Sequence, residues 1–204
     1  TGTRTILSQS DTAGSPFYFG SSSTSDSFGT IKMTDDWKEL NNKNFYIDDE
    51  WHYYTIVNDG IIGDSATIID TSALYIDGTL VAKVMGQGKS YPKDEKFFIA
   101  TMWDTSGEYF SGLIDGVSIW DRKLAPDEIG TLYNSGTGMD PTLDTINYFG
   151  SSNLIGFWPF NEGADSSVTD YSGSGYDGLI VGASWINIGT KLVPSVDITS
   201  IEEP

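Results

Sequence analysis

The stretch YFSGLIDGVSIWDRKLAPDEIGTLYN at residues 109–134 decides the fold of this chain. Residues 113–119 alternate in the way of a β-strand, and Asp121 and Arg122 follow as a turn. A short helix is predicted next, near residues 125–134. Proline is tolerated at its start, and the acids Asp127 and Glu128 face the positive end of its dipole. The stretch therefore predicts a strand that is closed by one amphipathic helix.

Two further segments have the pattern of antiparallel strands. Residues 50–57, EWHYYTIV, precede an Asn-Asp-Gly turn, and residues 73–82, ALYIDGTLVA, contain Asp-Gly at their centre. Asp-Gly between alternating apolar residues is a strong local signal for a two-residue hairpin. Together with short strand patterns along the rest of the chain, these segments predict an all-β protein.

In their order and spacing, these three segments resemble the laminin-G-like domain of the concanavalin A-like lectin/glucanase superfamily. The resemblance implies a two-sheet antiparallel jelly-roll sandwich with one capping helix. Proteins of this fold mostly bind glycans, proteins or calcium, and some catalyse. The resemblance alone does not choose a ligand, because one sandwich carries many functions.

The C-terminal part departs from that family's order. Residues 154–163, LIGFWPFNEG, and residues 170–178, DYSGSGYDG, look like segments that normally open such a domain. We expect a jelly-roll body at 1–135, a linker at 136–152 and a C-terminal segment at 153–204. That segment either completes the same sandwich, which would avoid open strand edges, or begins a second, truncated repeat.

The composition excludes several functional classes. The net charge is −18, with 11 Lys+Arg against 29 Asp+Glu, which disfavours nucleic acid and anionic membranes as partners. The chain has no cysteine, so it contains neither disulfides nor Cys-zinc sites, and we expect a bacterial or viral origin. No apolar run approaches the roughly 20 residues that span a bilayer. We expect an extracellular location, on a cell or virion surface.

The sequence offers little for catalysis. A retaining glucanase needs two carboxylates about 5–5.5 Å apart, commonly placed on one face of a strand. The acids here come as adjacent pairs in turns, such as Asp48-Asp49 and Asp94-Glu95, whose side chains point in different directions. The one histidine, His52, has no matching triad motif and is more typical of a structural residue. We therefore expect no enzyme activity.

A structural calcium ion is the cofactor that the resemblance implies. Carried over by motif, its ligands would be Asp115, Glu162, Asp170 and Asp177. Calcium prefers such hard oxygen ligands, and a carboxylate that interrupts an apolar strand needs a cation or several donors. The alternative is that Asp170 and Asp177 cap turns while Asp115 accepts backbone N–H bonds.

Glycan binding needs exposed aromatic rings together with polar side chains in loops. The candidate ligand-binding residues are Trp103, Asp104, Tyr109, Trp37, Tyr91 and Tyr18, whereas Trp51, Trp120 and Trp158 are expected in the core. The leading hypothesis is a carbohydrate-binding or adhesion module of a bacterial or viral surface protein. The alternative is a virion or filament component that self-associates or binds partner subunits, and a glycan-active enzyme is third.

Overall fold

The computed structural model describes residues 5–9, 17–21, 28–33, 36–39, 50–59, 69–87, 96–102 and 108–186. The chain divides into two compact units, residues 1–114 and 115–204. The regular secondary structure of the described residues is mostly β-strand in antiparallel sheets, with one α-helix. This agrees with the predicted all-β class, although the strands form four separate sheets rather than two continuous ones.

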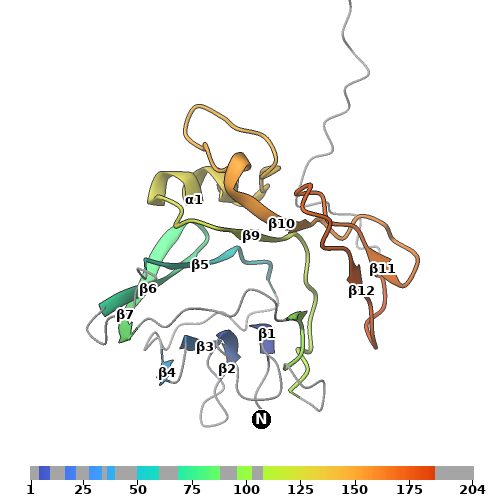
Figure 1. The fold of residues 1–204 in the computed structure, drawn as a ribbon, viewed down its shortest axis with the longest axis horizontal. Helices are drawn as coiled ribbons and strands as arrows, with labels where there is room; N and C mark the ends of the chain where they lie inside the picture. The colour runs from blue at the N-terminus through green and yellow to red at the C-terminus, as the bar shows by residue number, and fades with distance from the viewer. Residues whose placement is uncertain are drawn as a thin grey trace, which may run out of the picture. The chain divides into compact units, whose positions relative to one another are not determined.

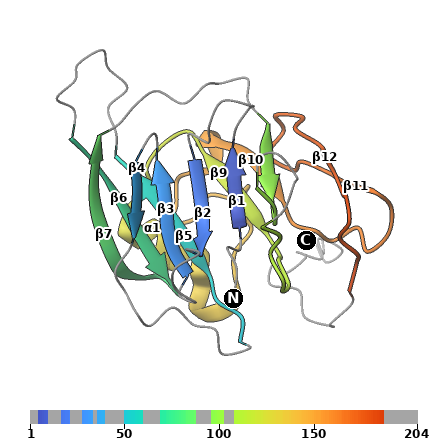
Figure 2. The same cartoon turned by 90° about the horizontal axis from the view of Figure 1, so that it is seen from below.

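The first unit contains two antiparallel sheets, which Figures 1 and 2 show from two directions. One has the order β4-β3-β2-β1-β8 and the other the order β5-β6-β7. The strands are β1 Thr5–Gln9, β2 Phe17–Ser21, β3 Phe28–Met33, β4 Asp36–Glu39, β5 Tyr54–Asn58, β6 Ile69–Ile76, β7 Thr79–Gln87 and β8 Phe97–Ile99.

The core of the first unit joins these two sheets. Phe19 of β2 packs with Leu74 and Ile76 of β6, and all three are at most 3% exposed. The rings of Phe19 and Tyr54 lie 6.0 Å apart between centroids. Apolar side chains of both sheets thus bury one another, which is the packing expected of a β-sandwich.

The predicted Asp-Gly hairpin is confirmed between β6 and β7. Asp77 and Gly78 both have positive φ, +51° and +74°, as a two-residue hairpin turn requires. Trp51, in contrast, is predicted to lie in the core of the protein. It precedes β5 and is 38% exposed, so that prediction was wrong.

The second unit begins with the predicted strand and helix. Strand β9 covers Val117–Trp120, and helix α1 covers Pro126–Tyr133. Ile129 and Leu132 are buried on the apolar face of α1, whereas Tyr133 is half-buried. The helix was predicted from its own sequence because a proline at the start and acids in the first turn are local signals.

The C-terminal segment pairs with this strand. After the short helical turns η1 Asn134–Gly136 and η2 Ser151–Asn153, β10 Leu154–Trp158 runs antiparallel to β9. A small sheet of β11 Ser167–Val168 and β12 Gly178–Leu179 follows. The C-terminal segment thus pairs with the strand that precedes α1, and the two compact units divide between residues 114 and 115. The division into a body at 1–135, a linker and a C-terminal segment stays a prediction.

The expected core tryptophans of this unit differ from each other. Trp158 on β10 is buried at 7% exposure, as predicted, and Trp120 on β9 is half-buried. A Cβ at Gly156 would lie 2.6 Å from the ring of Trp158. Glycine is therefore needed at position 156, because only a bare backbone lets the ring lie against the strand.

Candidate functional site

Only some of the predicted aromatic ligand-binding residues can be placed. Trp103, Asp104 and Tyr91 lie outside the described residues, and Trp37 lies on β4, where the side chains are not described. Tyr18 is 0% exposed on β2, and burial raises the pKa of its phenol to about 12. Tyr18 is therefore a core residue, and its predicted role as an exposed stacking ring was wrong.

Among the predicted rings whose side chains the structure describes, Tyr109 lies at the surface, at 60% exposure. Its neighbours on both sides are fixed to the sheet of β1 and β8. The N–H of Thr5 donates to the carbonyl of Glu108 at 2.9 Å, and the N–H of Phe110 donates to the carbonyl of Ala100 at 2.9 Å. Since the adjoining backbone is hydrogen-bonded, the Tyr109 ring is presented from a defined position.

Asp170 was predicted to bind calcium, but its carboxylate accepts hydrogen bonds at both oxygens. Oδ1 accepts the N–H groups of Phe157 and Ser172, and Oδ2 accepts the N–H of Tyr176 and the hydroxyl of Ser172, all at 2.9 Å. Its own N–H donates to Oδ1 of Asp177 at 2.9 Å. Asp170 thus acts as the central acceptor of a loop, the alternative that the sequence left open.

The pKa of Asp170 agrees with this role. Burial by itself raises the pKa of the carboxyl group, since Asp170 is 7% exposed. The hydrogen bonds from Phe157, Tyr176 and Ser172 outweigh burial, so the pKa lies below its ordinary value. The negative charge of Asp170 is therefore stabilised by these hydrogen-bond donors.

The other predicted calcium ligands, Glu162 and Asp115, also lie in the second unit. Oε1 of Glu162 accepts the N–H of Thr169 at 2.9 Å, while its buried Oε2 has no hydrogen-bond partner in the described part of the chain. Asp115 is half-buried just before β9. No group of three His, Cys, Asp or Glu side chains among the described residues is placed to hold a metal ion. The four predicted ligands are therefore not gathered as one group of side chains in the described residues, and the calcium ion stays a prediction.

His52 is held by a carboxylate in the first unit. Its Nδ1 lies 2.7 Å from Oδ2 of Asp77, and Oδ1 of Asp77 accepts the N–H of Tyr53 at 2.9 Å. The histidine side chain is 12% exposed. Asp77 thereby joins the segment that leads into β5 to the β6–β7 turn, which is the structural role that the sequence suggested for His52.

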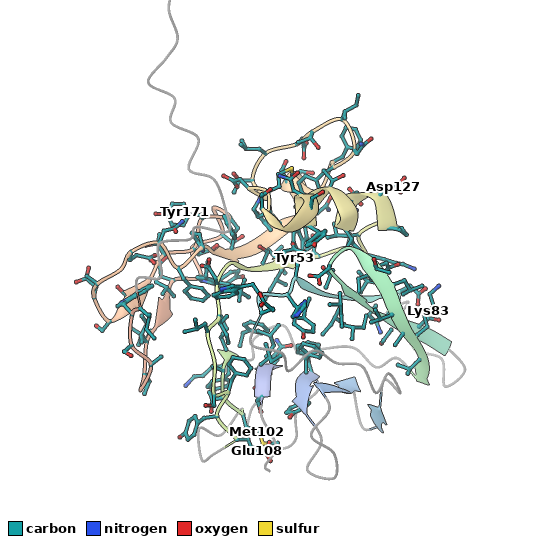
Figure 3. The ribbon with its side chains drawn as sticks, turned by 180° about the vertical axis from the view of Figure 1, so that it is seen from behind. Tyr53, Lys83, Met102, Glu108, Asp127 and Tyr171 are labelled. Atoms are coloured by element: carbon teal, nitrogen blue, oxygen red, sulfur yellow. The ribbon has the colours of Figure 1, made fainter. Side chains whose placement is uncertain are left out.

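Two exposed rings were missed in the sequence. Tyr171 and Tyr176 lie on the loop between β11 and β12, at 55% and 63% exposure, and Figure 3 labels Tyr171 there. They flank a Ser-Gly-Ser-Gly run, and the aspartates Asp170 and Asp177 lie just outside them. A pair of tyrosines that brackets small residues was the signal available.

Comparison with known proteins identifies one family that matches this chain. Its profile, described as the concanavalin A-like lectin/glucanases superfamily, matches residues 1–130, which include every strand of the first unit. No curated protein and no solved structure matches the chain. In the described residues, no helix is long and apolar enough to cross a membrane. The match covers more than half of the sequence and confirms the predicted resemblance, so the chain belongs to the laminin-G-like group of the concanavalin A-like lectin/glucanase superfamily.

Proposed function

We propose that this protein is a non-enzymatic carbohydrate-binding module of a bacterial or viral surface protein. Membership of a superfamily of lectins and glucanases supports a glycan as the ligand. The observation that carries the proposal is the exposed ring of Tyr109, whose neighbouring residues are bonded to β1 and β8. An exposed ring on a fixed backbone binds the apolar face of a sugar with little loss of conformational entropy.

The test is binding of the purified chain to a panel of immobilised polysaccharides. We expect retention on at least one of them, and Tyr109→Ala weakens that retention. Leu80→Ala is the control, because Leu80 is a 43% exposed apolar residue of the same unit on β7. Equal retention of both variants and the original protein would remove Tyr109 from the site.

The same panel tests the absence of catalysis. Soluble glucans are incubated with the protein, and the release of reducing sugar ends is followed. We expect none, because His52 is engaged by Asp77 and no strand of the described residues carries two carboxylates at the i and i+2 or i and i+4 spacing that places them on one face. Sustained release that scales with protein concentration would make the chain a glycan-active enzyme.

A second candidate function, a structural component of a virion or filament, is favoured by one loop of the second unit. Leu143, Ile146 and Phe149 are 49%, 87% and 62% exposed. The loop backbone is held by Thr145, whose N–H donates to the carbonyl of Tyr148, a fully buried residue, at 2.8 Å. Large apolar side chains on a fixed loop are typical of a subunit contact.

Sedimentation at increasing concentration separates the two functions. A structural subunit forms oligomers, and Ile146→Ser returns them to monomers. A chain that stays monomeric at all concentrations, and that binds polysaccharide, contradicts the structural role.

A further inference from the structure

The loop at residues 170–177 presents two tyrosine rings to solvent. Tyr171 and Tyr176 are 55% and 63% exposed, although most large side chains of β10, which precedes the loop, are buried. The four residues between the rings are Ser-Gly-Ser-Gly. The two rings are thus the only large side chains of this loop, and they stand at its two ends.

The backbone beneath both rings is fixed to β10. The N–H of Tyr171 donates to the carbonyl of Phe157 at 2.8 Å. The N–H of Tyr176 donates to the carboxylate of Asp170 at 2.9 Å, and its carbonyl accepts the indole N–H of Trp158 at 2.8 Å. The backbone of both tyrosines is therefore hydrogen-bonded to β10, so it is ordered before any ligand binds.

The surface between the rings is open. Gly173 and Gly175 have φ of +87° and +79°, and a Cβ at either position would meet no atom within 4 Å. Ser174 between them is exposed, and so is Asp177, whose Oδ1 accepts the N–H of Asp170. A ligand that spans the two rings can thus approach the backbone closely and exchange hydrogen bonds with a hydroxyl and a carboxylate.

The charges around the loop limit the ligand class. Between residues 124 and 186 the sequence has no lysine, arginine or histidine. Its charged side chains there are Asp127, Glu128, Asp140, Asp144, Glu162, Asp165, Asp170 and Asp177. The acids that belong to the loop itself are Asp170 and Asp177. Their negative charges repel the carboxylates of uronic or sialic acid sugars, whereas a neutral sugar is not repelled and its hydroxyl groups can donate hydrogen bonds to a carboxylate.

We propose that the 170–177 loop is a second glycan-binding surface, selective for neutral pyranose sugars. Tyr171 and Tyr176 stack on the apolar faces of sugar rings, and Asp177 accepts a sugar hydroxyl. Asp170 is a positioning residue that holds both tyrosines without touching the sugar. The ligand class rests on the proposed function, but the site is separate from Tyr109 in sequence and in its compact unit.

The experiment measures binding of the full chain to a soluble neutral β-glucan, a mannan and a xylan, with polygalacturonate as the acidic counterpart. For a neutral polysaccharide that binds, Tyr171→Ala and Tyr176→Ala each weaken binding about three- to tenfold, as expected for loss of one stacked ring. Tyr171→Phe and Tyr176→Phe keep most of the affinity. Ile186→Ala is the matched control, a large apolar side chain of 61% exposure in the same unit, and leaves binding unchanged.

Chemical nitration of tyrosines in the unaltered protein gives a readout that does not depend on the folding of any variant. We expect the bound polysaccharide to protect Tyr171 and Tyr176 from nitration, as located by mass spectrometry. Protection of Tyr109 alone, with unchanged binding of both alanine variants, overturns the second surface and leaves the proposed function standing. No binding of any polysaccharide overturns both. Stronger binding of polygalacturonate than of the neutral sugars overturns the charge selectivity.

Discussion

The guanidinium of Arg122 and the carboxylate of Glu128 form two parallel hydrogen bonds, of 2.8 and 2.6 Å. The same carboxylate accepts the N–H of Ala125 at 2.8 Å and the N–H of Phe149 at 3.2 Å. Glu128 is 7% exposed in the first turn of α1. One buried carboxylate thus joins the turn after β9, the start of the helix and the loop that leads to β10.

Replacing Arg122 should destabilise the second unit. Arg122→Ala leaves Glu128 buried without its charged partner, and we expect a loss of about 2–3 kcal/mol in the free energy of unfolding. This is less than for a fully buried pair, because the arginine side chain is 29% exposed. Urea unfolding measures the loss. Asp127→Asn, at an exposed acid in the same helical turn, serves as the control and should cost far less.

The same pair predicts how stability depends on pH. The hydrogen bonds from Arg122, opposed by burial and aided by the backbone N–H groups, lower the pKa of Glu128 from 4.5 to about 2. A carboxyl group with a lowered pKa in the folded state adds stability above its unfolded pKa. That contribution is lost as the pH falls through the folded pKa. Between about pH 4.5 and 2 the original protein should therefore lose about 2–3 kcal/mol that Glu128→Gln does not lose. Parallel unfolding curves of the two proteins across this range would contradict the shift.

Asp170 should stabilise the protein without calcium. Asp170→Ala leaves three backbone N–H groups and one hydroxyl without their acceptor, and we expect a loss of about 2–4 kcal/mol in the free energy of unfolding. Thermal unfolding of the original protein with added calcium and with chelator should give the same midpoint. A midpoint that calcium raises in the original protein but not in Asp170→Ala would restore the calcium site.

The contact between His52 and Asp77 predicts graded losses of stability in three variants. Asp77→Ala removes the acceptor of both His52 and the N–H of Tyr53, and it places alanine at a φ of +51°, where asparagine and aspartate are better tolerated. We expect a loss of about 2–3 kcal/mol for Asp77→Ala and about 1 kcal/mol for Asp77→Asn or His52→Ala. Chemical unfolding of the three variants measures this order. An equal loss in all three would mean that the turn conformation contributes nothing.

The elements that could be predicted from the sequence are those formed by neighbouring residues. The Asp77-Gly78 hairpin follows from the preference of these two residues for positive φ, and α1 follows from its proline and acids. The succession of strands along residues 1–130 could also be predicted, because the order of the strands and their turns resembles that of the family.

The sites were less accessible, because exposure and hydrogen bonding depend on distant residues. Tyr18 and Tyr109 looked alike as tyrosines beside loops, yet one is fully buried and the other is 60% exposed. Asp170 lies in a loop whose sequence predicted a cation site. Only the folded structure brings the N–H groups of Phe157 and Tyr176 to its carboxylate. Nothing local in the sequence distinguishes a carboxylate that binds a metal ion from one whose oxygens already accept hydrogen bonds from the protein.

The sequence by itself determined the class of fold, the Asp-Gly hairpin, the closing helix and the acidic character that disfavours anionic partners. Only the tertiary structure decided which rings face solvent and which carboxylates are engaged, as with Asp170 and the N–H of Phe157, which are 13 positions apart in the chain. The physical reason is the distance along the chain between the residues that determine each property. Backbone preferences and net charge are properties of neighbouring residues or of composition. Burial and hydrogen-bond satisfaction exist only once strands distant in sequence have packed together.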